Sequence, residues 1–200
     1  MAAPRGLARP VSYVSEVNFA RVVFLVVLTG CSVQVHAACD SKSAIYVVGV
    51  LARGIELNER FKRSVSSDDE DAYRSLRKQA EQYDEEIAMP CVRRAQKLLS
   101  HRSNQALMRR LMEFAVAYEN SADETVSAAM AAVFAVRPDD VQRVWKKFPQ
   151  AQRQVLSRSI ESGWIAQSRA LPLIQRRDRE ARLRLMLRES QTKQDSGVKS

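Results

Sequence analysis

Glycine is scarce in this 200-residue sequence, and none occurs from residue 55 to residue 162. Tight β-hairpin turns need backbone conformations with positive φ, which glycine adopts most readily. A stretch of 108 residues without glycine therefore excludes a fold built from β-hairpins there. The six glycines and six prolines of the whole chain are also too few for a collagen-like or low-complexity protein.

Residue types that carry metal and catalytic chemistry are also few. The chain has two histidines, His36 and His101, and its three cysteines form no Cys-x-x-Cys pair. Zinc sites and Ser-His-Asp triads are therefore not expected. A glycine-rich phosphate loop and a Gly-x-Ser-x-Gly motif are missing from the sequence as well. We expect no metal site and no cofactor, and we expect a protein that binds rather than an enzyme.

Apolar residues recur at helical spacing along the chain. Residues 43–63 predict a first helix, whose apolar stripe is Ile45, Val48, Leu51, Ala52 and Ile55. A second stripe runs from Tyr73 to Ile87, and Pro90 either ends this helix or opens the next. The acidic residues 84–86 are expected on its exposed face. Gly49 and Gly54 are expected to let a neighbouring helix approach closely.

Shorter helices with clear start and stop signals follow. They are predicted over residues 91–101, over residues 104–119 after a Ser103 or Asn104 cap, and after a capping box at residues 121–124. Pro138 and Pro149 begin two more, the second ending at Gly163 as a C-cap glycine. The fold class is therefore all-α, either an irregular helical bundle or a short helical-repeat superhelix that begins with a long antiparallel helix hairpin.

An export signal is predicted at the N-terminus. Residues 22–28 read VVFLVVL after Arg21, which is too short to span a bilayer but long enough for the apolar core of a secretory signal. Residues 28–31 resemble a bacterial lipobox, which implies lipidation and cleavage at Cys31. Small residues at Val35 and Ala37 offer the other processing site, after Ala37. Both alternatives predict an exported periplasmic protein, which the first would anchor to the membrane through a lipid on Cys31 and the second would leave soluble or secreted.

The remaining cysteines, Cys39 and Cys91, predict a disulfide bond, because two thiols in an oxidising compartment can pair. The two predicted N-terminal helices are nearly equal in length, each about 30 Å long. An antiparallel hairpin of that kind returns the chain near Pro90 to the place that it left near Cys39. The Cα separation of about 5.5 Å that a disulfide needs is then within reach.

Positive charge is concentrated at the C-terminus, where residues 175–200 carry eight basic and four acidic side chains. We divide the chain into a signal segment (1–37), an all-α domain (38–174) and a basic C-terminal helix with a disordered tail (175–200). Ion pairs Asp178–Arg182 and Glu180–Arg184 are expected on this helix. The same spacing favours a structural surface helix whose Leu183, Met186 and Leu187 pack inward. The alternative is that its arginines bind an anionic surface: Arg176, Arg177, Arg179, Arg182, Arg184 and Arg188.

Residues 160–164 read Ile-Glu-Ser-Gly-Trp. This string resembles the Glu-Ser-Gly-aromatic segment around the catalytic acid of lytic transglycosylases, which cleave peptidoglycan. The resemblance implies that Glu161 would protonate the leaving oxygen, provided that burial raises its pKa. The Gly-Leu-Met-Gln segment that follows in that family is not found here. A helix end with a tryptophan packed on the core explains the same residues.

These observations favour an exported, non-catalytic helical protein of the bacterial envelope. Its expected partner is another envelope protein or an anionic membrane surface, and export argues against nucleic acid. The alternative is a peptidoglycan-cleaving enzyme that uses Glu161. The oligomeric state and the working face are not determined by these patterns.

Overall fold

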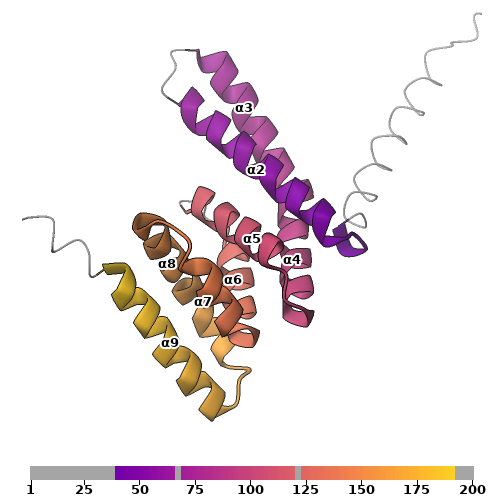
Figure 1. Ribbon diagram of the computed structural model, residues 1–200. Helices are drawn as coiled ribbons and strands as arrows, with labels where there is room; N and C mark the ends of the chain where they lie inside the picture. The colour runs from indigo at the N-terminus through magenta and orange to yellow at the C-terminus, as the bar shows by residue number, and fades with distance from the viewer. Residues whose placement is uncertain (1–38, 66–68, 120–122, 192–200) are drawn as a thin grey trace, which may run out of the picture. The chain divides into compact units, whose positions relative to one another are not determined.

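The computed structural model describes residues 39–65, 69–119 and 123–191, which belong to one compact unit, Val35–Ser200. The described residues form helices and contain no strand, so the all-α prediction is confirmed (Figure 1). In chain order the elements are α2 (Ala44–Ser64), α3 (Glu70–Tyr83), the π-helical turn η1 (Asp84–Ala88), α4 (Met89–His101), α5 (Gln105–Ala117), α6 (Thr125–Val136), α7 (Pro138–Trp145), α8 (Gln150–Ser168) and α9 (Leu173–Gln191).

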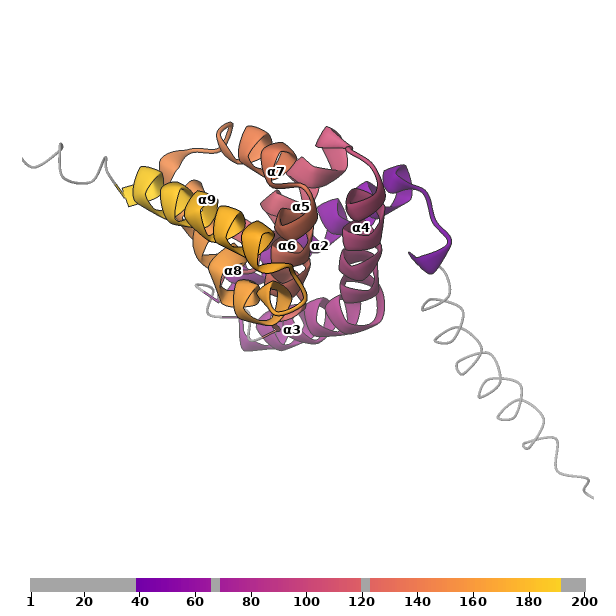
Figure 2. The ribbon, with the colours of Figure 1, turned by 90° about the horizontal axis from the view of Figure 1, so that it is seen from below.

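The most apolar helix, α6, lies at the centre of a helical bundle. It packs most extensively against α8 and also against α4, and it lies between them in Figure 2. A helix that is apolar on nearly all sides must be covered on all sides, and α6 is buried from Ala129 to Ala135. Other helices pack around this centre: α5 contacts α2, and α9 contacts α8. Leu183 and Met186 of α9 belong to the same core cluster.

Side-chain caps start three of the helices. The Ser43 hydroxyl accepts a hydrogen bond from Tyr46 N (3.5 Å), and a carboxylate oxygen of Asp69 accepts one from Ala72 N (2.9 Å). Asn104 Oδ1 accepts one from Leu107 N (3.0 Å), which settles the choice between Ser103 and Asn104. Each of these side chains satisfies a backbone N–H that the first helical turn leaves without a partner.

The expected capping box at residues 121–124 is not what starts α6. The helix begins at Thr125, and Asp123 Oδ1 accepts a hydrogen bond from Thr125 N (2.7 Å), while Glu124 makes no side-chain cap. Residues 120–122 lie outside the described part of the chain. The carboxylate of Asp123 thus caps the backbone in an aspartate turn, which competes with the capping-box arrangement.

The buried face of α2 differs from the predicted stripe. Ile45 is 85% exposed, whereas Val47, Val50 and Leu57 are buried. Valines at 47, 48 and 50 allow two overlapping apolar stripes on this helix, and periodicity alone does not choose between them. Contacts with α5, α3 and α4 select the stripe that includes Val47 and Val50.

The first two helices lie side by side (Figure 1). The rings of Phe61 and Tyr73 are 5.5 Å apart between centroids, and farther along the pair the Tyr83 hydroxyl donates a hydrogen bond to Val50 O (3.0 Å). The 14 residues of α3 continue without a break into the five residues of η1, and together they nearly match the 21 residues of α2. Pro90 lies in the first turn of α4, where a missing N–H is tolerated.

Gly163 does not end a helix. It lies inside α8, which continues to Ser168, at the crossing with α6. A Cβ atom added at Gly163 would lie 2.2 Å from Ser127 O of α6. The glycine is therefore needed for close approach of the two helix backbones, a tertiary requirement that resembles a C-cap signal in sequence.

Gly54 meets the expectation of close approach and Gly49 does not. A Cβ atom at Gly54 would lie 2.7 Å from Phe114 Cε2, so the ring of Phe114 occupies the space of the missing side chain. A Cβ atom at Gly49 would meet no atom within 4 Å. The two glycines lie on the same helix but on differently covered faces.

Candidate functional site

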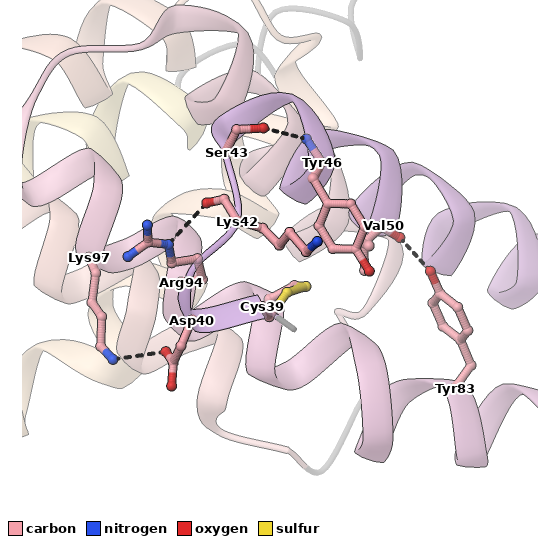
Figure 3. The surroundings of a disulfide bond; sticks show 10 residues. Cys39, Asp40, Lys42, Ser43, Tyr46, Val50, Tyr83, Arg94 and Lys97 are labelled. Carbon is pink, nitrogen blue, oxygen red and sulfur yellow. Dashed lines mark hydrogen bonds and ion pairs between the residues drawn. A yellow bond between two sulfur atoms is a disulfide. The ribbon is translucent and has the colours of Figure 1, made fainter. Parts of the chain in front are cut away.

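The structure joins Cys39 to Cys91 in a disulfide bond. Their Cα atoms are 5.3 Å apart across a sequence separation of 52 residues, and both side chains are buried. Figure 3 shows Cys39 beside the start of α2. The bond therefore ties the beginning of the described chain to the first turns of α4.

Polar contacts reinforce this connection (Figure 3). Arg94 Nε donates a hydrogen bond to Lys42 O (3.2 Å), and the Lys97 ammonium pairs with Asp40 (3.1 Å). The Lys42 ammonium lies 5.4 Å from the centre of the Tyr46 ring. These contacts are exposed and individually weak, so the disulfide is the principal link here.

The arginines of α9 form two groups by position, and the first, Arg176, Arg179 and Arg182, makes contacts within the protein. Arg179 Nε donates a hydrogen bond to Ala135 O of α6 (3.2 Å). Arg182 pairs with Asp139 of α7 and, as expected, with Asp178 (3.2 Å). Arg179 and Arg182 hold α9 against the bundle.

A second expected ion pair of α9 has a different partner. Glu180 pairs with Arg176 (3.0 Å) rather than with Arg184. Both arginines lie one helical turn from Glu180, so sequence spacing alone could not choose between them.

The second group lies on the outer face of α9. Arg177, Arg184 and Arg188 are exposed and recur at helical spacing on the side opposite to the buried Leu183 and Met186. Arg177 and Arg184 form no ion pair with any residue that the structure describes. Apolar residues share this face: Ile174 (84% exposed), Ala181 and Leu185 (51% exposed). We call these six residues the α9 outer face.

The remaining candidate residues from the sequence are Glu161 and Cys31. Glu161 is exposed on α8, whereas the resemblance to lytic transglycosylases implies a buried acid. Trp164 is buried and packs edge-on against Phe134, with ring centroids 5.8 Å apart. Cys31 and the whole segment 1–37 lie outside the described residues, as does the tail from 192 to 200.

No recognised structural feature of the described residues, and no known protein, indicates what this site does. No described helix is both long enough and apolar enough to cross a membrane. Among the same residues there is no group of three or more metal-ligating side chains. No family model, curated protein or solved structure matches the chain. Its function therefore has to be inferred from the residues themselves.

A feature that the sequence pattern does not predict lies where η1 meets the end of α5. Asp84 is expected on an exposed face, but it is half-buried and accepts a hydrogen bond from the Tyr118 hydroxyl. The π-helical turn η1 begins at Asp84. Such turns rotate the side chains that follow them, and they are frequent at functional sites. A contact between residues 34 positions apart leaves no signal in the local sequence.

The surroundings of Asp84 favour its neutral form. Burial raises the pKa of this carboxyl to about 6, although the hydrogen bond from Tyr118 acts in the opposite direction. Burial likewise raises the pKa of the Tyr118 hydroxyl, and it raises that of Tyr83 to about 12. Asp84 therefore loses its proton at a higher pH than an ordinary aspartic acid does.

A groove of about 620 Å³ opens beside Asp84 and Tyr118. Its walls come from α2, α3 and the end of α5, where Asn58 Nδ2 and Lys62 Nζ both donate hydrogen bonds to Ala117 O (2.6 and 2.8 Å). We call it the α2–α3 groove. The side chains that matter for what it can bind are Phe61, Lys62, Tyr73, Arg77, Glu81 and Asp84.

Replacing Asp84 by asparagine should change how stability depends on pH. The folded-state pKa lies above the unfolded value of 3.8, so the folded protein holds a proton that the unfolded chain loses, and the contribution of Asp84 to wild-type stability falls as pH rises from about 4 to 7. The asparagine of the variant does not titrate. After discounting for partial exposure, we expect the variant to gain about 1 kcal/mol relative to wild type between pH 4 and pH 7.

Urea unfolding at both pH values measures this difference. Glu85→Gln is the matched control, because Glu85 is the exposed neighbour of Asp84 on η1. An Asp84→Asn effect of the same size at pH 4 and pH 7 would contradict the assignment of a raised pKa to Asp84.

Proposed function

We propose that this protein is an exported, non-catalytic helical protein that binds an anionic membrane surface through the α9 outer face. The observation that carries the proposal is the sorting of charge on α9. Arg177 and Arg184 point away from the bundle, while Asp178 and Glu180 are paired with other arginines. The outer face therefore presents positive charge and apolar side chains together.

This combination suits the boundary between lipid headgroups and acyl chains. Arginine guanidinium groups pair with lipid phosphates, and each basic residue near an anionic surface contributes about 1 kcal/mol. Exposed apolar side chains such as Ile174 and Leu185 add to binding when they enter the interface.

Two features support export. The apolar run at residues 22–28 with the lipobox-like residues 28–31 fits a secretory signal, and a disulfide such as Cys39–Cys91 persists in oxidising compartments. A lipobox cysteine receives a diacylglyceryl group, whose two acyl chains would anchor the protein stably by themselves, so the contribution of the α9 outer face has to be measured without them. Intact mass of the protein from membrane and soluble fractions distinguishes lipidation at Cys31 from cleavage after Ala37.

Vesicle binding tests the role of the α9 outer face. In a Cys31→Ser background, which removes the candidate lipid, we expect Arg177→Gln/Arg184→Gln to bind vesicles of equal parts phosphatidylglycerol and phosphatidylcholine about 30-fold more weakly than the parent. The matched control is Arg60→Gln/Arg93→Gln, which removes the same charge from exposed positions on α2 and α4. Sedimentation of vesicles with bound protein measures the partition coefficient.

Changing the ionic strength separates the electrostatic contribution to vesicle binding from the apolar contribution. Raising the ionic strength should weaken binding of the parent more than that of the α9 variant, because screening acts on the charges that the variant lacks. Equal losses in the α9 variant and in the Arg60/Arg93 control would mean that net charge alone drives binding. A parent protein that stays in the supernatant would leave another envelope protein as the partner to seek.

A further inference from the structure

The α2–α3 groove has the size and chemistry of a ligand site, and it does not involve α9. Small-molecule sites are concave, of a few hundred to a thousand Å³, with aromatic walls and a small number of polar groups. We propose that this groove binds a neutral saccharide. The proposal is independent of membrane binding by the α9 outer face.

Aromatic rings supply one wall of the groove. Phe61 of α2 and Tyr73 of α3 lie next to each other, with ring centroids 5.5 Å apart and ring planes inclined by 32°. Both are only partly buried and both line the groove. The C–H faces of a sugar ring pack well on such flat apolar surfaces, whose negative π-face attracts the slightly positive hydrogens.

Polar atoms with unused hydrogen-bonding capacity surround these rings. The Arg77 guanidinium donates from Nε to Glu81 Oε1 (2.7 Å), which leaves Glu81 Oε2 able to accept. The Lys62 ammonium uses one of its three N–H donors on Ala117 O. A sugar hydroxyl donates and accepts at once, so it can bridge a carboxylate and a cation of this kind.

The balance of charge argues for an uncharged ligand. At pH 7, above the pKa of about 6 of Asp84, two cations, Lys62 and Arg77, line the same groove as two carboxylates, Glu81 and Asp84. A phosphate or carboxylate ligand would gain from the cations but be repelled by Glu81, and a polyamine would meet the opposite conflict. A neutral polyhydroxylated molecule uses both kinds of group without this conflict.

Saturation-transfer difference NMR with the full-length protein tests the proposal. The probes are two neutral saccharides, chitotetraose and maltotetraose, with glucose 6-phosphate as the charged comparison. We expect at least one neutral probe to bind. We also expect Tyr73→Ala and Glu81→Gln each to weaken that binding at least tenfold, because one wall or one acceptor is lost.

Glu70→Gln is the matched control, since Glu70 pairs with Arg74 on the same helix at the same spacing but outside the groove (2.6 Å). Glu81 is exposed, so Glu81→Gln keeps the test valid even where Tyr73→Ala unfolds the α2–α3 pair. Binding of neither neutral probe, tighter binding of glucose 6-phosphate, or equal effects of Glu81→Gln and Glu70→Gln would each overturn the proposal.

Discussion

Gly163→Ala should lower the free energy of unfolding by about 3 kcal/mol, at the upper end of overpacking effects in protein cores. The added methyl group would lie 2.2 Å from Ser127 O and 2.9 Å from the Cβ of Ala131. The first of these is a backbone atom of α6, so no rotation of a side chain relieves the overlap. The two helices with the most extensive contact in the bundle must move apart.

Gly49→Ala is the matched control for Gly163→Ala. It adds the same methyl group to a helix interior where no atom lies within 4 Å. Alanine is favoured over glycine in helices by about 1 kcal/mol, so this variant should be more stable than wild type. Thermal unfolding of both variants measures the contrast, and a Gly163→Ala protein as stable as wild type would contradict the close crossing of α6 and α8.

Removing the disulfide with Cys39→Ala/Cys91→Ala should lower the free energy of unfolding by about 4 kcal/mol. The bond closes a loop over a sequence separation of 52 residues, and it restricts the unfolded chain more than the folded one. The remaining links between this segment and α4, Arg94 to Lys42 O and Lys97 to Asp40, are exposed and cannot replace it.

Urea unfolding of the oxidised protein, the reduced protein and the double variant separates the causes. Reduction removes the covalent link and keeps both buried sulfurs, whereas the variant also loses their packing. The reduced protein should therefore lie between the other two. Equal stability of the oxidised and reduced protein would contradict the pairing of Cys39 with Cys91. So would the reaction of both thiols with an alkylating reagent in the folded protein as it is isolated.

Local sequence could predict some features of α9, but it could not predict the surroundings of Asp84. The inward packing of Leu183 and Met186 and the ion pair of Asp178 with Arg182 follow from helical spacing, and the structure has both. Spacing could not tell which arginines are used inside the protein, because Arg179 reaches Ala135 and Arg182 reaches Asp139 on other helices. The choice of outward arginines is therefore a tertiary property.

The Asp84–Tyr118 contact lies wholly beyond such reasoning. An acidic run in a helical stretch is solvated in most proteins, and nothing near Asp84 in sequence indicates a partner 34 residues away. The groove beside it exists because α2, α3 and α5 meet there. Its aromatic and charged residues each look like ordinary members of exposed helix faces until those helices are brought together.

The helical class and the proximity of Cys39 and Cys91 could be worked out from order along the chain, since they depend on hydrogen bonds and spacing within one or two neighbouring helices. The same reasoning narrows one helix cap to Ser103 or Asn104. The buried stripe of α2, the role of Gly163 and the environment of Asp84 could not be worked out in this way. Each of these depends on which surface a distant helix covers, and that is decided by how all the helices together bury apolar area. A covering helix removes water from the side chains beneath it and fills the space around them. The same side chain therefore has a different free energy on a covered face than on an exposed one.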